Sequence, residues 1–242
     1  MAQQQVAVVA GVGVGLGKAL ANRFARDGYE TVIAARNKKT LDKIAKDIGG
    51  GGGGSVHVVP TDLCEPAAVE ALFAEADRVG TLGVAIFNAG PFHMQPLLEV
   101  EAKTFEDIWR INCFAGFLVG QAAARRMAPN KKGTIIFTGA TASLKGGAQF
   151  VAFAAAKAGL RSVAQSMARS LGPQGIHVAH VVNDGLIDMP ENWDEMRDYM
   201  ESLPPDGIMK PDAMAETYFA LHRQEPTAWT FEADLRPGPE SF

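Results

Sequence analysis

The sequence predicts an α/β fold in which a doubly wound parallel sheet of about seven strands carries helices on both faces. Two observations indicate this fold. Short, continuously apolar runs alternate with helical segments along the 242 residues, and a glycine-rich turn follows the first run. Strands that are apolar throughout are typical of a sheet buried on both faces. The helices between them then serve as the crossovers that join parallel strands.

The expected elements follow one another in a regular order. Each strand is a buried run rich in Val, Ile and Ala, and each helix candidate fills the interval before the next run. The run of six glycines at 49–54 is expected to form a surface loop between the second helix and the third strand. The segment 228–237 is expected to form a last strand at the sheet edge or a subunit contact. The other strands are expected at 6–10, 31–35, 56–59, 84–88, 134–138 and 177–182, and the helices near 17–27, 38–48, 66–79, 103–128, 151–171 and 211–223.

Composition narrows the classes of function. The formal charge of −4 leaves no basic patch that would favour nucleic acid. The two cysteines, Cys64 and Cys113, lack metal-ligand spacing and favour a reducing compartment. No apolar run approaches the ~18 residues of a membrane span, and the first residues do not resemble a signal peptide. We therefore expect a cytoplasmic protein that binds no nucleic acid, no membrane and no metal.

A glycine-rich turn joins the first strand to the first helix. Gly11, Gly13, Gly15 and Gly17 lie within it, and the helix begins at once. Glycines let the backbone approach a pyrophosphate, which then sits at the positive amino end of the helix. The spacing of residues 11, 15 and 17 differs from the broader Gly-x-Gly-x2-Gly fingerprint. Taken alone, the turn is also consistent with a tight connection that binds nothing.

Five further short motifs follow in order along the chain. They are Thr61-Asp62-Leu63 after the third strand, Asn88-Ala89-Gly90 at the end of the fourth, Asn112 in the next helix, Lys157 in a Phe-x3-Lys pattern, and Asn183-Asp184-Gly185 after the sixth strand. Over roughly residues 5–190 the chain therefore resembles the short-chain dehydrogenase/reductase family.

This resemblance implies a single Rossmann-type, NADP(H)-binding domain over 1–242, with a variable substrate cap around 186–210. It implies that the motif after the third strand holds the adenine ring, that the lysine holds the ribose hydroxyls, and that the backbone of Ile187 anchors the carboxamide. The cofactor-binding residues are then Gly11, Gly15, Leu16, Gly17, Arg36, Asp62, Leu63, Asn88, Ala89, Gly90, Lys157, Gly185 and Ile187.

The end of the second strand indicates which nicotinamide cofactor is used. A protein selective for NAD(H) places a carboxylate there to bind the ribose 2′-hydroxyl. This chain carries Arg36, with Lys38 and Lys39 close behind. A guanidinium can form paired hydrogen bonds to a 2′-phosphate. We therefore expect NADP(H), although a solvated basic helix start would give the same residues.

The catalytic set of the family is altered in this chain. The resemblance places Phe153 where the family carries its proton-donating tyrosine, and Ala140 where it carries the serine that orients the carbonyl. Asn112 and Lys157 are retained. Thr141 or Ser143 would replace the serine only if the loop shifted; otherwise both are loop hydroxyls. The donor could then be Lys157 or a water held through Asn112, or a cap residue such as Tyr199 or His93.

The segments expected to border the cofactor are apolar and would favour a hydrophobic substrate, unless they form only an amphipathic cover over the core. The carboxamide-binding threonine of the family is replaced by Asp188 or Met189. By analogy with related proteins, the helices at 103–128 and 151–171 would assemble a homodimer or homotetramer. The apolar residues are Phe92, Met94, Phe150, Leu186, Met189, Trp193, Met196, Tyr199 and Met200.

The leading hypothesis is an atypical NADP(H)-dependent oxidoreductase that reduces a small hydrophobic carbonyl or an activated double bond. Loss of the phenol removes a general acid, which typically contributes ~10²–10⁴ in rate, but proximity to the cofactor remains. The rival hypothesis is an inactive NADP(H)-binding sensor or partner subunit. An ordinary alcohol dehydrogenase that uses a displaced serine and water is the third reading.

Overall fold

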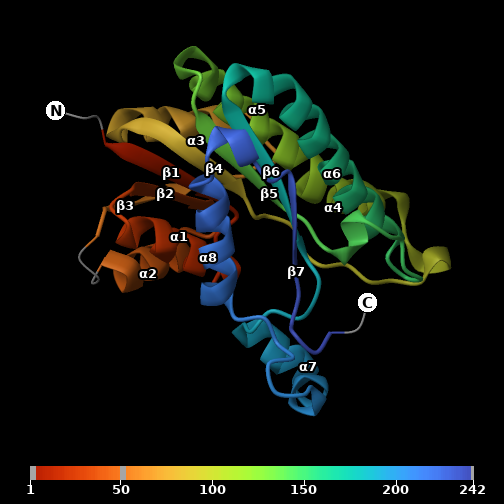
Figure 1. The fold of residues 1–242 in the computed structure, drawn as a ribbon. Helices are drawn as coiled ribbons and strands as arrows, with labels where there is room; N and C mark the ends of the chain where they lie inside the picture. The colour runs from red at the N-terminus through yellow and green to blue at the C-terminus, as the bar shows by residue number, and fades with distance from the viewer. Residues whose placement is uncertain (1–3, 50–52, 241–242) are drawn as a thin grey trace.

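The computed structural model describes residues 4–49 and 53–240, which form one seven-stranded parallel sheet with helices on both faces (Figure 1). The strand order is β3-β2-β1-β4-β5-β6-β7, and every pair of neighbours is parallel. The predicted fold class is therefore confirmed. The strands are β1 (Gln5–Ala10), β2 (Glu30–Ala35), β3 (Val56–Pro60), β4 (Thr81–Phe87), β5 (Gly133–Thr138), β6 (Ile176–Asn183) and β7 (Glu232–Leu235).

The central strands are apolar because both of their faces are covered. Helices α1 (Leu16–Arg26), α2 (Lys38–Gly49) and α8 (Pro211–His222) pack on one face. On the other lie α3 (Pro66–Val79), α5 (Ala115–Met127) and α6 (Val151–Leu171) (Figure 1). Successive side chains of a strand point to opposite faces, so Val6 and Val8 enter one core while Ala7 and Val9 enter the other.

The helix expected near 103–128 contains a π-helical turn. It comprises α4 (Ala102–Trp109), a π-helical turn (Arg110–Phe114) and α5. The wide turn contains Asn112, whose side-chain amide donates hydrogen bonds to the backbone oxygens of Ile108 (3.1 Å) and Pro91 (3.3 Å). Single π-turns of this kind are frequent at functional sites. The helix expected near 103–128 is therefore present, and the π-helical turn within it is a feature that the sequence did not predict.

Two carboxyl-terminal elements complete the described chain. Helix α7 (Pro190–Ser202) lies within the expected cap and is kinked at Met196. The short strand β7 pairs with β6 at the sheet edge, so the expectation of an edge strand is confirmed. Of the glycine run at 49–54, residues 50–52 lie outside the described residues.

Candidate functional site

The glycine-rich turn leaves β1 at the carboxyl edge of the sheet. Gly11 has a φ of +100°, and a Cβ atom there would lie 2.3 Å from the backbone nitrogen of Ala89. A Cβ at Gly17 would lie 2.8 Å from the backbone oxygen of Gly11. Only glycine therefore permits this close packing of turn, helix and neighbouring strand. The first turn of α1 carries no acidic side chain, so its positive end is suited to an anion.

The other two glycines of the turn lie in different surroundings. A Cβ at Gly13 would meet nothing within 4 Å, so packing does not require glycine there. A Cβ at Gly15 would lie 3.1 Å from the sulfur of Met189. Met189, in the segment that follows β6, therefore packs against the turn at Gly15. Leu16 is buried at the start of α1 and packs in the core.

The Asn-Ala-Gly motif connects β4 to this turn. The Asn88 side chain donates a hydrogen bond to the backbone oxygen of Gly11 (3.0 Å). Gly90 has a φ of +137°, and a Cβ there would lie 2.0 Å from Oδ1 of Asn112. Asn88, Ala89 and Gly90 thus bring the glycine turn and the π-helical turn to one edge of the sheet.

Asn112 presents an unused acceptor to this edge. Its side chain is fully buried, and its amide nitrogen is engaged by Ile108 and Pro91. Its Oδ1 has no hydrogen-bond partner among the described residues. A buried acceptor without a donor costs about 1–3 kcal/mol, so this oxygen is suited to a water or ligand hydroxyl.

Phe153 and Lys157 lie one turn apart on α6 and share a face. Both are buried, with 7% and 4% of their surfaces exposed. The Lys157 ammonium donates a hydrogen bond to the backbone oxygen of Thr138 (3.0 Å) and lies 5.7 Å from the centre of the Phe153 ring. Burial lowers the pKa of Lys157 to about 8. A lysine with a pKa near neutrality can give up a proton at working pH.

The hydroxyl groups of the loop after β5 already have hydrogen-bond partners. The backbone N–H of Ala140 donates to Oγ of Ser143 (3.1 Å), and Ser143 is buried. The hydroxyl of Thr141 donates to the carboxylate of Asp184. Ala140 itself offers no side-chain donor. In this arrangement neither hydroxyl is free to take the place of a serine at position 140.

The end of β2 lies open to solvent. Arg36 is exposed there, and Lys38 is paired with Asp42 (2.7 Å). Lys39 instead borders a cavity of about 550 Å³ between α1 and α2, beside the glycine turn. Three lysines face this cavity, of which Lys18 is paired with Asp47 (2.7 Å). The lining residues are Val14, Lys18, Lys39, Thr40, Lys43, Ile44, Asp47 and Pro190.

The motif after β3 forms a tight turn. The backbone N–H of Cys64 donates to the carboxylate of Asp62 (2.9 Å), and Leu63 is buried beneath. Asp62 is exposed, and Arg36 and Asp62 both act electrostatically on the Cys64 thiol. The two expected adenine-side residues therefore lie near one another at the carboxyl edge of the sheet.

The segment after β6 runs along the same edge. Gly185 has a φ of +153°, and the backbone oxygen of Ile187 accepts a hydrogen bond from the Asn192 side chain (2.8 Å). Asp188 accepts one from the Trp193 indole (2.8 Å). Asp188 is thus engaged within the cap, and Met189 points toward Gly15.

Two features of this edge were missed by sequence reasoning. The Phe92 ring lies edge-on against both Phe153 (5.5 Å between centres) and Phe150 (5.6 Å). Asp184 joins the loop after β5 to the carboxyl-terminal segment through Thr141 and Arg236. Asp184 itself could have been noticed in the sequence, because the motif Asn183-Asp184-Gly185 resembles Asn-Pro-Gly of the family and Asp184 replaces the proline. The residues that Asp184 contacts lie far along the chain and could not be predicted.

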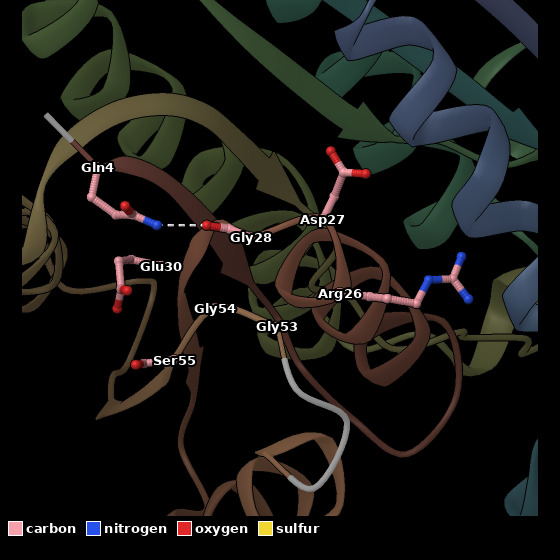
Figure 2. A pocket seen from close by; sticks show the side chains of 8 residues that line it. All are labelled: Gln4, Arg26, Asp27, Gly28, Glu30, Gly53, Gly54 and Ser55. Atoms are coloured by element: carbon pink, nitrogen blue, oxygen red, sulfur yellow. Dashed lines mark hydrogen bonds between the residues drawn. The ribbon is translucent and has the colours of Figure 1, made fainter. Parts of the chain in front are cut away.

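A second cavity, of about 580 Å³, lies at the opposite edge of the sheet (Figure 2). It adjoins the start of β2, and Gln4 donates there to the backbone oxygen of Gly28 (2.6 Å). Asp27 and Glu30 border it together with Arg26. The acidic groups and the distance from the glycine turn make it unsuited to a dinucleotide.

Two other kinds of feature are absent from the part of the chain that the structure describes. In 4–49 and 53–240 there is no group of three or more His, Cys, Asp or Glu side chains that could hold a metal. Among the helices of these residues, none is long and apolar enough to cross a membrane.

Comparison with known proteins gives consistent results. A model of the short chain dehydrogenase family matches residues 5–199. A short-chain dehydrogenase from Rhodopseudomonas palustris has 39% sequence identity and a TM-score of 0.81, over 97% of this chain and 98% of the other. A metagenomic short-chain oxidoreductase in complex with NADP has 25% identity and a TM-score of 0.81, over 96% and 97%.

A curated relative from Thauera aromatica also covers most of the chain. It is the (2S)-[(R)-hydroxy(phenyl)methyl]succinyl-CoA dehydrogenase subunit BbsD, 31% identical over 229 residues, which are 90% of this chain and 89% of that protein. The family match covers more than half of the chain, and the glycine turn, the Asn-Ala-Gly motif and the buried lysine lie together at the sheet edge. This chain therefore belongs to the short-chain dehydrogenase family of NAD(P)-dependent oxidoreductases.

Proposed function

We propose that this protein is an NADP(H)-dependent oxidoreductase that reduces a small hydrophobic carbonyl or an activated double bond without the usual tyrosine and serine. The observation that carries the proposal is the pair on α6. Phe153 provides a phenyl ring where the family has a phenol, and the buried Lys157 beside it retains an ammonium group. The binding half of the site is thus kept while the proton-donating half is changed.

The choice of NADP(H) is supported by charge at the end of β2. Arg36 is exposed there, and no carboxylate occupies the position that would bind a ribose 2′-hydroxyl. Lys18, Lys39 and Lys43 border the adjoining cavity. A 2′-phosphate would be attracted by these charges and would be repelled by a carboxylate. The NADP bound by the metagenomic relative is consistent with this choice.

The residues of the chain fit a nicotinamide dinucleotide. Gly11 and Gly17 permit the tight turn that brings the amino end of α1 to the sheet edge, where a pyrophosphate would sit, and Asn112 offers a buried, unused acceptor at the same edge. When bound, the nicotinamide supplies the hydride. Lys157 holds a proton near neutral pH and would deliver it to the reduced substrate, directly or through a water held by Asn112.

The ring cluster supports an apolar substrate. Phe92, Phe150 and Phe153 form a wall of edge-on rings beside Lys157, and Phe92 remains 66% exposed. An apolar group placed against this wall would bury that ring. The Thauera aromatica relative carries a phenyl group in the name of its substrate, in keeping with such a wall.

A screen of NADPH oxidation tests the activity. Wild-type protein and Lys157→Met are each mixed with NADPH and a panel of hydrophobic aldehydes, ketones and enones. We expect slow oxidation by the wild type with at least one compound and a loss of at least tenfold in Lys157→Met. Tight NADPH binding with no oxidation of any compound, or an equal rate in the variant, would contradict the proposed reaction.

A non-catalytic partner subunit is the second candidate. The Phe153 ring lies against Phe92, which also contacts Phe150. Ser143 is bonded within its own loop, and the Thr141 hydroxyl is bonded to Asp184. The Thauera aromatica relative is itself described as a subunit. This candidate predicts that NADPH binds and is oxidised only when another protein is added.

We further propose a homodimer or homotetramer in the cytoplasm. Trp109, Phe114 and Phe117 stack along α4 and α5, with Trp109 39% and Phe117 37% exposed. Such a continuous exposed aromatic strip is typical of an interaction surface. Cys64 and Cys113 are free thiols, in keeping with a reducing compartment.

A further inference from the structure

Asp184 lies where three chain segments meet. It follows β6 directly and precedes Gly185 and Ile187, which are expected to hold the nicotinamide. In the family motif Asn-Pro-Gly this position is a proline, which has no carboxylate and no backbone N–H. Asp184 has both, and its side chain is only 17% exposed.

Both carboxylate oxygens and the backbone N–H of Asp184 have partners. Its Oδ1 accepts a hydrogen bond from the Thr141 hydroxyl, in the loop that follows β5. Its Oδ2 lies 3.5 Å from Nη1 of Arg236, which is 20% exposed. Its backbone N–H donates to the oxygen of Leu235 in β7 (2.8 Å). The residue therefore binds the loop after β5 and the carboxyl-terminal segment at the same time.

The packing around the next residue strengthens this connection. A Cβ at Gly185 would lie 2.6 Å from Cδ of Pro237, so the backbone after Asp184 is in close contact with the carboxyl-terminal segment. Arg236 is also bonded to the carboxylate of Asp234 in β7. The partly buried pair between Asp184 and Arg236 is less screened by salt than a fully exposed pair.

We infer that Asp184 is a positioning residue: it links Thr141, Arg236 and the backbone at 185–187 into one unit that sets the nicotinamide end of the dinucleotide site. The inference rests on the proposed function. It gives the carboxyl-terminal strand a part in cofactor binding, although β7 lies at the edge of the sheet. The adenine end of the site, at Arg36 and the glycine turn, does not depend on this link.

The test compares two ligands that share the adenine end. NADPH contains the nicotinamide, whereas adenosine 2′,5′-bisphosphate lacks it. Fluorescence and calorimetric titrations measure both affinities for wild type, Thr141→Val, Thr141→Ser and Asp184→Asn. We expect Thr141→Val and Asp184→Asn to lose about tenfold in NADPH affinity, since a hydrogen bond or ion pair to a charged group is broken. Thr141→Ser keeps the hydroxyl and should bind like the wild type.

Affinity for adenosine 2′,5′-bisphosphate should stay within about twofold in all variants. Asp234→Asn is the matched control, because it removes a carboxylate from the same arginine without touching the loop or the 185–187 segment. Thermal unfolding of each variant verifies that the fold is retained.

Three outcomes would overturn the inference. Equal losses for both ligands would indicate general damage, and unchanged NADPH affinity in Thr141→Val and Asp184→Asn would show that the link does not position the nicotinamide. Both leave the proposed function intact. A wild-type protein that binds neither ligand would instead contradict the proposed function, and the inference with it.

Discussion

Phe153 is central to the proposed chemistry. Its ring contacts Phe92 and lies 5.7 Å from the Lys157 ammonium, and it can neither donate nor accept a proton. The neighbouring loop supplies no replacement, since Ala140 has no polar side chain and Ser143 is bonded within the loop. Lys157 is an ionisable group beside Phe153, and its lowered pKa suits it to the proposed proton transfer.

The substitution Phe153→Tyr, which restores the phenol, tests whether position 153 lacks a proton donor. In Phe153→Tyr, the new hydroxyl would stand beside a buried ammonium that favours its ionised form. For a carbonyl substrate we expect kcat/KM to rise about a hundredfold, measured from the oxidation of NADPH. Phe150→Tyr is the control, because it adds the same hydroxyl to a neighbouring ring of the cluster. No gain with a confirmed carbonyl substrate would contradict the role assigned to position 153; a double-bond substrate should show little change.

The pKa of Lys157 makes a prediction about stability. Burial lowers this pKa from 10.5 to about 8, so between those values the unfolded chain binds the proton that the folded protein releases. The cost of burying the ammonium, about 3 kcal/mol, is therefore fully present below pH 8 and disappears as the pH rises toward 10.5.

Comparison with Lys157→Met isolates this contribution, since the other ionisable groups are common to the two proteins. The Lys157 charge also acts on His180, but the pKa of His180 is about 4, far below this pH range. We expect the free energy of unfolding of Lys157→Met to exceed that of the wild type by the largest amount below pH 8. That advantage should shrink steadily up to pH 10.5 in urea denaturation experiments. A difference that does not change with pH would mean that Lys157 is not buried as an ammonium.

Among the elements, the glycine turn can form its close packing only with glycine at positions 11 and 17. Gly11 has a left-handed φ and touches Ala89, while Gly13 has open space where a side chain would be. We expect Gly11→Ala to lower the free energy of unfolding by about 2 kcal/mol or more and Gly13→Ala to change it by less than about 0.5 kcal/mol. Equal effects in chemical denaturation would contradict the packing described for the turn.

The elements also show which features a sequence can reveal. The strands were predictable because burial on both faces makes them apolar throughout, and the glycine turn and Asn-Ala-Gly motif were predictable because local backbone geometry requires those residues. The π-helical turn was not, because it depends on bonds from Asn112 to Ile108 and to the distant Pro91. The cap helix α7 was not among the expected helices, since six of its 13 residues are charged and it is kinked at Met196.

The same limit applies to the candidate site. The sequence places Phe153 and Lys157 on one helical face from their spacing alone. It does not reveal that Phe92 covers Phe153, or that Asp184 contacts residues more than forty positions away on each side, because those contacts arise only when the sheet assembles.

For the molecule as a whole, the aromatic strip on α4 and α5 predicts assembly. Phe117→Asp should place a charge within the strip and yield a monomer, because burying an unpaired carboxylate costs several kcal/mol. Size-exclusion chromatography with light scattering measures the mass. Leu98→Asp, at a fully exposed apolar residue outside the strip, should leave the assembly unchanged. A monomeric wild type, or a Phe117→Asp variant of unchanged mass, would contradict this assignment of the interface.

We propose that this protein binds NADP(H) through the glycine turn and Arg36. The most direct test is a fluorescence titration of the purified protein with NADPH and, in parallel, with NADH, repeated on Arg36→Asp and on Arg78→Asp, an exposed arginine of α3. We expect wild type and Arg78→Asp to bind NADPH at least tenfold more tightly than NADH, and Arg36→Asp to reverse that preference. If the wild-type protein bound neither cofactor, the proposed NADP(H) site at the glycine turn and Arg36 would be contradicted.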